Sequence, residues 1–482
     1  MKKAITLLLL AAMLTSVISC GGTETPSGDT SSSDDTTTEA PVETDIFEGL
    51  DTTAYEGRTF NWMIPDLDVY QGDLWVDEST GEVYDDAIHQ RNSLVQDRFG
   101  ITINPIIEPY TWAIRDQYTG KIRTSVQSGD NAYDLVACHS YLLPQLALED
   151  LLLNLNDVNA LRLDQSHWSQ LVYDALTYKD KVFFMSGDIS VNILEFANVL
   201  FMNKKLLNEY NLEAPYELAK AGKWTQDKLE AMIKDTSRDV NGDSVMDGND
   251  MWGYIFHDAS SIHNISVSFD IPLSKHEGDT IVFNLDSEDA AFAAEYTKSF
   301  LIDNPDTHPA SSKTGGSGKE IFMAGRAIFY AHQLHTVESL REMEDDFGIM
   351  PFPKYDEAQK DYITSVRDSF MGYCIPSDTK DAEFVGTIME ALCVSGSEYV
   401  IPAYYDVVLK GKTARDEESA EMLDIIKGSL DVNFAYAYSQ MLGSISNIYV
   451  EVYQKNIDLA SHWASKKTSV ETKLADLLTK LS

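Results

Sequence analysis

The segment from Asp239 to Asp250 concentrates oxygen-bearing side chains at the spacing of a calcium-binding loop. Such a loop supplies about six to eight oxygens, from side chains at positions one, three, five, nine and twelve and from a backbone carbonyl at position seven. The glycine usual at position six is Ser244 here, and position twelve is an aspartate rather than a bidentate glutamate. The alternative interpretation is an acidic Asn-Gly turn that bonds its own backbone. The predicted calcium ligands are Asp239, Asn241, Asp243, the carbonyl of Val245, Asp247 and Asp250.

Two other stretches approach chemical motifs without completing them. Segment 311–320 contains glycines and a lysine, but Lys313 stands where a phosphate-binding loop needs its first glycine, and Glu320 stands where it needs Ser or Thr. A linker is the better interpretation. His332 and His335 lie three residues apart and have no third ligand nearby in the sequence, so we expect no metal site there.

No catalytic motif stands out. The sequence has no Gly-x-Ser-x-Gly elbow, no His-Glu-x-x-His and no suggestive cysteine-histidine arrangement. Glycoside hydrolysis needs only two suitably separated carboxylates, however, and the chain has 77 acidic residues. An exported carbohydrate-active enzyme therefore stays as an alternative to a binding protein.

Apolar runs alternate with helical repeats at the start of the folded part. Five segments follow one another in the order strand, helix, strand, helix, strand. A doubly wound, mostly parallel sheet is the simplest α/β fold with this order, and ligands of such sheets bind beyond the carboxyl ends of the strands. The predicted segments are 58–65, 84–99, 101–107, 112–128 and 133–138.

Polar and aromatic side chains follow two of these predicted strands. His139, Ser140 and Tyr141 come directly after the third strand, and Tyr110 and Trp112 come after the second. Because the carboxyl ends of parallel strands meet at one edge of a sheet, we predict that these five residues line a ligand cleft.

Composition limits the classes of partner. The chain has 482 residues, enough for about two to three domains, and a net charge of -40. Such a charge opposes binding to nucleic acid or to an anionic membrane surface. We expect most of it to lie on a solvated surface.

The first 20 residues have the pattern of an export signal. Lys2 and Lys3 precede an apolar run that is too short for a permanent membrane span, and Ser19-Cys20 is followed by two glycines. This end matches a bacterial lipobox, which implies cleavage before Cys20 and a diacylglyceryl group on its sulfur; the alternative is an ordinary cleaved signal. Residues 21–50 are rich in Ser, Thr and acidic residues, and we expect a disordered tether.

The remaining cysteines lie in apolar contexts. They are Cys138, Cys374 and Cys393. Three cysteines cannot all pair, so we expect buried free thiols, with Cys138 and Cys374 as potential neighbours on strands of one sheet.

Two further regions carry a recognisable pattern. An apolar strand at 198–202 leads into Asn203-Lys204 at the start of a helix, and segment 321–353 has the order helix, strand, helix, strand. Its distinctive residues are Phe322, Gly325, Arg326, Ala327, Asp346, Phe347, Gly348, Pro351 and Pro353. Together with the lipobox, these features resemble the extracellular solute-binding proteins of ATP-binding-cassette (ABC) importers, family 1, which are similar to maltose-binding protein.

This resemblance implies a periplasmic-binding-protein-like (type II) α/β fold, with two lobes joined by a hinge and a C-terminal helical cap. Lobe 1 would comprise 55–195 and 326–376, and lobe 2 would comprise 199–325 and 377–482 with the C-terminal helices. The chain would first cross between the lobes near Glu195 to Val199.

The resemblance also implies further cleft residues. Asp188 and Asn192 would lie near the hinge. The segment after the predicted strand 251–255 would supply contacts from lobe 2, and the end of the returning strand would face the cleft. The residues in these last two segments are His257, His263, Asn264, His332 and Gln333.

The function implied is capture of a small solute, most often a carbohydrate or oligosaccharide, and its delivery to an ABC transporter permease. We expect a lipid-anchored monomer on the extracellular face of the membrane, or on the periplasmic side if the organism has an outer membrane. It would bind no nucleic acid and need no cofactor beyond a structural Ca²⁺. A solute-binding sensor that feeds a membrane signalling partner is a further alternative.

Overall fold

The computed structural model describes residues 45–257, 260–278, 280–310, 316–405 and 417–482. All elements described below belong to one compact unit, Ile46–Ser482. Cys20, the signal peptide and most of the tether lie outside the described residues and stay predictions.

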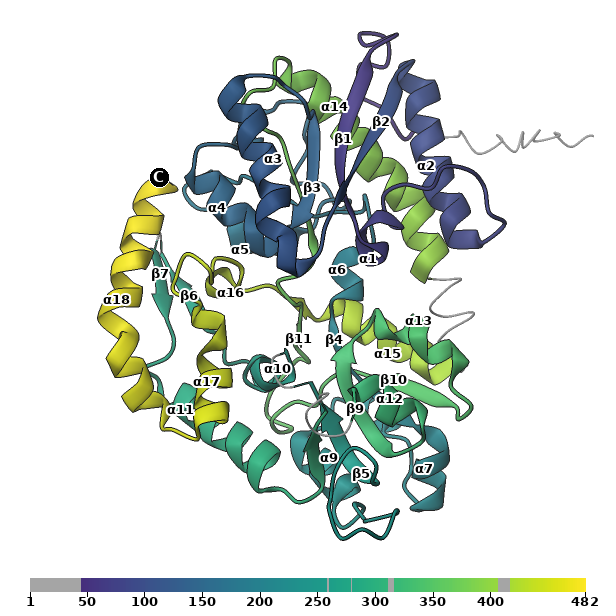
Figure 1. The fold of residues 1–482 in the computed structure, drawn as a ribbon, viewed down its shortest axis with the longest axis vertical. Helices are drawn as coiled ribbons and strands as arrows, with labels where there is room; N and C mark the ends of the chain where they lie inside the picture. Colours follow the sequence, from purple (N-terminus) through teal and green to yellow (C-terminus); the bar gives the residue numbers. More distant parts are fainter. Residues whose placement is uncertain (1–44, 258–259, 279, 311–315, 406–416) are drawn as a thin grey trace, which may run out of the picture. The chain divides into compact units, whose positions relative to one another are not determined.

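The first sheet has four strands in the order β12-β3-β1-β2 (Figure 1). β1 pairs in parallel with β2 and β3, whereas β12 runs antiparallel to β3. The parallel part follows from the predicted β-α-β-α-β order, because each crossover helix returns the chain to the same edge of the sheet. The strands are β1 (Thr59–Asp66), β2 (Thr102–Pro109), β3 (Leu135–His139) and β12 (Met371–Cys374).

Two helices with glycine ends connect the parallel strands. α2 (Val83–Phe99) is followed by Gly100 at φ 63°, and α3 (Arg115–Ser128) is followed by Gly129 at φ 69°. Glycine takes this left-handed conformation readily, and it closes the helix end. Both predicted helices are confirmed, apart from a 3₁₀ turn at Trp112–Ile114 before α3.

The second sheet has five strands in the order β10-β4-β9-β5-β8. β4 runs antiparallel to β10 and β9, and β5 runs parallel to β9 and β8. The strands are β4 (Asn198–Asn203), β5 (Trp252–Phe256), β8 (Thr307–Pro309), β9 (Ala327–Gln333) and β10 (Phe347–Met350).

The prediction that segment 326–376 belongs to lobe 1 is wrong for β9 and β10. β9 and β10 flank β4 in the second sheet, where Phe201 pairs with Tyr330 and with Ile349. An apolar strand can join either sheet, so its hydrophobic pattern does not reveal its partner. Only β12 returns to the first sheet.

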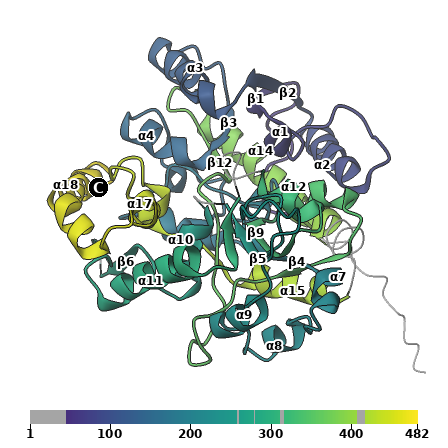
Figure 2. The same cartoon turned by 60° about the horizontal axis from the view of Figure 1, so that its bottom comes forward.

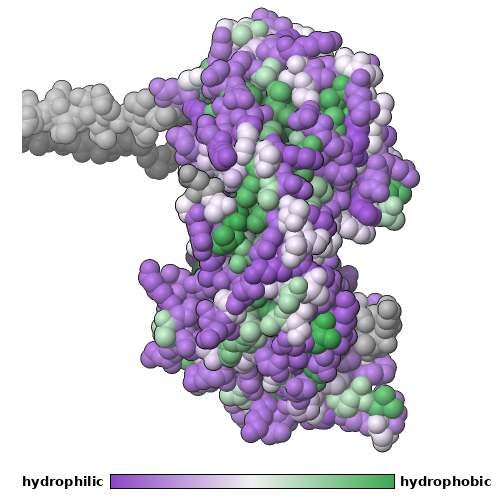
Figure 3. Space-filling model, turned by 90° about the vertical axis from the view of Figure 1, so that its left-hand side faces the viewer, coloured by the Kyte–Doolittle hydropathy of each residue, from purple (hydrophilic) through white to green (hydrophobic). Residues whose placement is uncertain are grey.

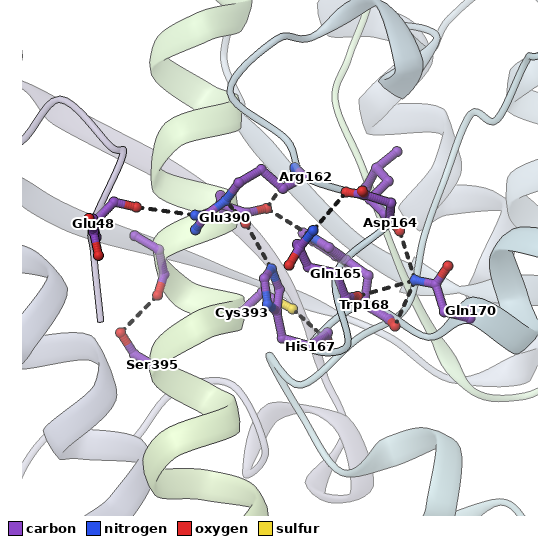
Figure 4. A network of polar contacts seen from close by, with 12 residues as sticks. Glu48, Arg162, Asp164, Gln165, His167, Trp168, Gln170, Glu390, Cys393 and Ser395 are labelled. Carbon is purple, nitrogen blue, oxygen red and sulfur yellow. Dashed lines mark hydrogen bonds and ion pairs between the residues drawn. The ribbon is translucent and has the colours of Figure 1, made fainter. Parts of the chain in front are cut away.

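The apolar helix α14 (Ala382–Ser395) was assigned to lobe 2 from the sequence, and this assignment is also wrong. α14 packs against α2 beside the first sheet (Figure 1). Its fully buried Glu390 accepts hydrogen bonds from Arg162 Nε and Trp168 Nε1 at 2.7 Å each, and His167 Nε2 lies 2.7 Å away (Figure 4). These partners fix α14 to segment 162–168, which follows β3 in the chain.

One helical stretch, Ala382–Tyr405, is long and apolar enough to span a membrane by length and composition among the described residues. The protein buries 72% of its most apolar window. This stretch contains α14, so its hydrophobicity is explained by its place in the core.

The chain passes between the two sheets at Ala197 and again at Val366, where the two segments form an antiparallel bridge. The first passage lies inside the predicted crossing. Beside it, β11 (Thr364–Ser365) pairs in parallel with β13 (Leu430–Asp431).

The C-terminal helices pack against helices that lie between β5 and β8 in the chain. α17 (Ile448–Lys455) contacts α10 (Ser260–Ser268) and α11 (Glu288–Lys298), and α18 (Leu459–Lys480) contacts α11 and α17 (Figure 2). The chain turns between α17 and α18 at Asn456, where φ is 48°.

The remaining secondary structure is short. It comprises α1 (Asp68–Gln71), α4 (Leu143–Leu148), α5 (Gln170–Leu176), α6 (Asn192–Glu195), α7 (Lys204–Glu209), α8 (Tyr216–Lys220), α9 (Gln226–Ile233), α12 (Gly318–Met323), α13 (Thr336–Ser339), α15 (Glu417–Gly428), α16 (Phe434–Ala437), β6 (Ser274–Glu277) and β7 (Thr280–Phe283).

Most tryptophans lie in the core. Trp62, Trp168, Trp224 and Trp463 are almost fully buried, whereas Trp112 is 52% exposed. On the face shown in Figure 3, hydrophilic residues dominate and hydrophobic residues form small separate patches.

Candidate ligand-binding site

A cavity of about 380 Å³ lies where the strands of the first sheet end; we call it the aromatic cavity. β1, β2 and β3 run parallel, so their carboxyl ends meet at one edge, and the antiparallel β12 begins at that edge. A 3₁₀ turn near the C-terminus, Ile445–Asn447, completes the wall. The lining residues are Leu67, Tyr70, Tyr110, Trp112, His139, Tyr141, Arg367, Asp368, Ser369, Ser446 and Asn447.

Four residues predicted from strand ends come together around this cavity. The Trp112 ring centroid lies 5.5 Å from those of both Tyr141 and His139, and Tyr110 lies beyond His139 at 6.5 Å. The guanidinium of Arg115 lies 4.4 Å from the Trp112 ring centroid. The arrangement offers an exposed aromatic surface beside buried polar groups, as small-molecule sites do.

His139 is uncharged in this site. Its Nδ1 accepts a hydrogen bond from the backbone N–H of Tyr141 at 3.2 Å, which leaves the proton on Nε2. Burial, with a contribution from the charge of Arg367, lowers the pKa of His139 to about 3. The ring therefore offers a ligand one N–H donor.

Two further polar groups of the cavity suit a hydroxylated ligand. The buried hydroxyl of Tyr110 has no hydrogen-bond partner among the described residues. Burial raises the pKa of Asp368 to about 6, although Arg367 opposes the shift. Unpaired buried polar groups cost free energy, which a ligand hydroxyl would recover.

Ser140, also predicted as a cleft residue, holds the turn before β12. Its Oγ donates to the carbonyl of Asp368 at 2.6 Å, and its backbone N–H donates to the carbonyl of Phe370 at 2.9 Å. Ser140 thus positions residues of the cavity and does not line it.

Gln333 and Asn264 lie in a buried network near the passage between the sheets. Gln333 Nε2 donates to Asn198 Oδ1 at 2.9 Å, Asn198 Nδ2 donates to Ser365 Oγ at 2.8 Å, and Ser365 Oγ donates to Asn264 Oδ1. Neither predicted residue lines the aromatic cavity. They join β4, β9, β11 and α10.

A second cavity, of about 520 Å³, contains three imidazoles. The ring of the predicted residue His332 lies 5.8 Å from the rings of both His257 and His335. Burial, with smaller contributions from the neighbouring imidazoles and Arg367, lowers the pKa of His332 to about 3. Burial, with a contribution from Arg367, lowers the pKa of His335 to about 4. No group of three or more His, Cys, Asp or Glu in the described part of the chain is arranged to hold a metal ion.

A third cavity, of about 310 Å³, is acidic and was missed by the sequence analysis; we call it the acidic cavity. Asp73 and Glu195 are hydrogen-bonded to each other, and burial raises the pKa of Asp73 to about 6 and that of Glu195 well above its usual range. Tyr84 donates to Asp73 at 2.8 Å. More than a hundred residues separate the two carboxyls in the sequence, so no local pattern could reveal the pair.

Asn192, predicted near the hinge, supports this pair. Its Nδ2 donates to the carbonyl of Val69 at 3.0 Å and to Glu195 at 3.2 Å, and its Oδ1 accepts from Met371 N–H at 2.8 Å. It therefore ties α1, α6 and β12 together.

Two other predicted residues are packed against neighbours. Asp188 lies so close to Gly396 that a Cβ there would approach the Asp188 carbonyl oxygen to 1.8 Å. His263 stacks on Tyr436, with ring centroids 4.3 Å apart and planes at 2°. Neither lines the aromatic cavity.

The segment from Asp239 to Asp250, which we call the Asp-rich loop, hydrogen-bonds its carboxylates to its own backbone N–H groups. Asp239 accepts from the N–H groups of Gly242 and Ser244, and Asp250 accepts from those of Val240 and Asp247. Ser244 takes a left-handed φ of 66°, which is the conformation that favours glycine at this position. The backbone suits a calcium loop, but its oxygens are turned to N–H groups, so calcium binding stays a prediction.

The fold is shared with known binding proteins at low sequence identity. An ABC substrate-binding protein from Listeria monocytogenes in complex with cycloalternan matches with TM-score 0.55 and 12% identity, over 88% of this chain and 99% of that one. The maltose/maltodextrin-binding domain MalE from Bdellovibrio bacteriovorus, bound to maltotriose, gives 0.55 and 15%, over 87% and 100%. UspC from M. tuberculosis gives 0.56 and 15%, over 86% and 100%. These matches confirm the predicted type II periplasmic-binding-protein fold.

A search of curated protein sequences finds no match. A family model described as bacterial extracellular solute-binding protein matches residues 97–390, well over half of the chain. That range contains the second sheet, the passages at Ala197 and Val366 and most of the aromatic cavity. The chain belongs to the family of bacterial extracellular solute-binding proteins.

Proposed function

We propose that this protein binds a neutral carbohydrate or oligosaccharide in the aromatic cavity and delivers it to an ABC transporter permease. The observation that carries this proposal is the exposed surface of Trp112 and Tyr141 beside buried, hydrogen-bonding side chains. A sugar ring stacks its C–H face on an aromatic ring and directs its hydroxyls to polar groups at the side.

The polar groups match hydroxyls in kind. His139 Nε2 supplies a donor, Asp368 an acceptor, and the unpartnered Tyr110 hydroxyl can act as either. Asp368 is the only acid among the described lining residues, and Arg367 lies beside it. Above the raised pKa of Asp368 these charges offset each other, which favours a neutral ligand.

Two of the structurally similar proteins have cycloalternan and maltotriose bound, which supports a carbohydrate as the ligand class. The alternative of a glycoside hydrolase lacks support in the aromatic cavity. Its usual mechanism needs a pair of carboxyls, and Asp368 has no acidic partner among the described residues that line it.

Residues from two parts of the unit line the cavity, the strand ends of the first sheet and the turn with Ser446 and Asn447. A ligand that contacts both parts only in a closed state would drive closure. We assign the hinge to the paired passages at Ala197 and Val366. Cys20 would carry the lipid anchor, and residues 21–50 would tether the protein to the outer face of the membrane.

The test is a thermal-shift screen of the protein without its signal peptide and tether against mono- and oligosaccharides, amino acids and short peptides. A neutral saccharide should raise the unfolding midpoint, because ligand at a hundred times its Kd adds about 2.7 kcal/mol to the stability. Chromatography of the same samples should recover the saccharide intact. A response to amino acids or peptides alone would overturn the ligand class, and consumption of the saccharide would favour an enzyme.

A further inference from the structure

A cavity of about 440 Å³ lies among the start of α9, the helix α11 and the loop after β10; we call it the α9–α11 cavity. It shares no lining residue with the aromatic cavity. Half of its lining residues are acidic, and none is Lys, Arg or His. They are Thr225, Gln226, Asp227, Glu230, Tyr296, Tyr355, Asp356 and Glu357.

An exposed ring forms one wall of this cavity. Tyr355 is 40% exposed, and its ring centroid lies 4.9 Å from that of Phe292 and 5.1 Å from that of Phe269. Phe269 is buried, so the ring rests on the core. The face of such a ring attracts a cation through its quadrupole.

The carboxylates raise the negative potential of the cavity. Glu230 accepts a hydrogen bond from the Tyr296 hydroxyl, and burial together with repulsion from Asp227 raises the pKa of Glu230. Lys228 Nζ lies 3.4 Å from Asp227 Oδ2, and both side chains of this ion pair are exposed to solvent. Asp356 uses one oxygen to accept two backbone N–H bonds, which leaves its other oxygen for a ligand.

A buried amide also lines the cavity. Gln226 is only 3% exposed, and its Nε2 has no hydrogen-bond partner among the described residues. An unpaired amide at this depth costs free energy, which an acceptor on a bound molecule would recover.

We propose that the α9–α11 cavity is a second binding site, which takes a guanidinium or alkylammonium group. The cation would lie over the Tyr355 ring between the carboxylates, and a carbonyl or carboxylate of the same molecule would accept from Gln226. A neutral sugar fits less well, because it would desolvate several carboxylates without supplying a counter-charge. The group can belong to a free molecule such as arginine or to an exposed side chain of a peptide.

Calorimetric titration of the full mature protein at low salt tests this site. The probes are free arginine, the peptide acetyl-Gly-Arg-Gly-amide and their citrulline analogues, which keep the shape and lose the charge. Arginine or its peptide should bind with a Kd below about 10 mM, at least tenfold tighter than the citrulline analogue, and the affinity should fall with added salt. Tighter binding of the peptide would indicate a peptide source, and tighter binding of arginine a free molecule.

Variants locate the binding. The double variant D227N/E230Q should weaken arginine binding at least tenfold, whereas E295Q, which changes a carboxylate of α11 outside the cavity lining, should leave it unchanged. Trp112→Ala should also leave it unchanged, which separates this site from the proposed carbohydrate site. Equal binding of citrulline, equal binding by the double variant, or no binding of either arginine probe would overturn the proposal.

Discussion

The aromatic cavity and the acidic cavity differ in how far their polar groups satisfy one another. In the aromatic cavity, the Tyr110 hydroxyl has no partner among the described residues and His139 keeps one N–H available. In the acidic cavity, Asp73, Glu195 and Asn192 bond one another and the backbone around the hinge. Unsatisfied groups favour a ligand, whereas satisfied groups fix the positions of elements.

This contrast separates two kinds of buried polar residue. Residues of the acidic cavity should affect stability when they are changed, and residues of the aromatic cavity should affect ligand binding.

The largest expected effect belongs to Asn192→Ala. The change removes three buried hydrogen bonds and leaves two backbone groups and the Glu195 carboxyl without them, so we expect a loss of about 3 kcal/mol in the free energy of unfolding. Urea unfolding measures it. Asn104→Ala, which removes an exposed bond to Asn61, should cost less than about 0.5 kcal/mol. A similar loss in both variants would contradict a special role for the acidic cavity.

Trp112→Ala should have the opposite profile. Loss of the stacking surface should weaken saccharide binding by about 2 kcal/mol, roughly thirtyfold in Kd, while the free energy of unfolding changes little because the ring is half exposed. Calorimetry with the saccharide from the screen measures it. The control is Phe292→Ala, which changes an exposed aromatic residue that does not line the aromatic cavity. Unchanged affinity in the Trp112 variant would place the ligand elsewhere.

Asp73 makes the acidic cavity sensitive to pH. Its pKa rises from about 4 in the unfolded chain to about 6 in the fold, so its protonated form stabilises the protein below pH 4 and this contribution is lost as the pH rises through 6. Relative to Asp73→Asn, the free energy of unfolding of the wild-type protein should fall by up to about 3 kcal/mol between pH 4 and pH 7. Unfolding curves across this range measure the difference.

The control is Asp97→Asn, which changes an exposed aspartate of α2. Its difference from the wild-type protein should stay constant over the same range. A constant difference for Asp73→Asn as well would show that the pair does not titrate as its burial predicts.

The smallest effect is expected at the Asp-rich loop, whose carboxylates are already bonded to backbone N–H groups. Ca²⁺ must replace these bonds, so its net stabilisation should be about 1 kcal/mol. After chelator treatment, added Ca²⁺ should release or take up heat and raise the unfolding midpoint, and Asp239→Asn should remove both responses. No heat and no shift would eliminate the calcium site.

Much of the site could be predicted from sequence because it depends on local order. The alternation of strands and helices determines which strand ends meet at the edge of the first sheet. This brings Tyr110, Trp112, His139 and Tyr141 together. Thr225 shows the limit of local rules. A threonine just before a helix is a usual N-cap, yet the Thr225 hydroxyl donates to Asp227 instead of capping α9.

Tertiary structure decided what the local pattern leaves open. The α/β class, the helix ends at Gly100 and Gly129, and the family could be predicted from the sequence, because these depend on neighbouring residues. The sequence could not assign β9 and β10 to the second sheet or α14 to the first, because an apolar segment suits any core of the right shape. It also could not pair Asp73 with Glu195, because more than a hundred residues separate them. Their raised pKa values depend on burial that only the folded chain creates.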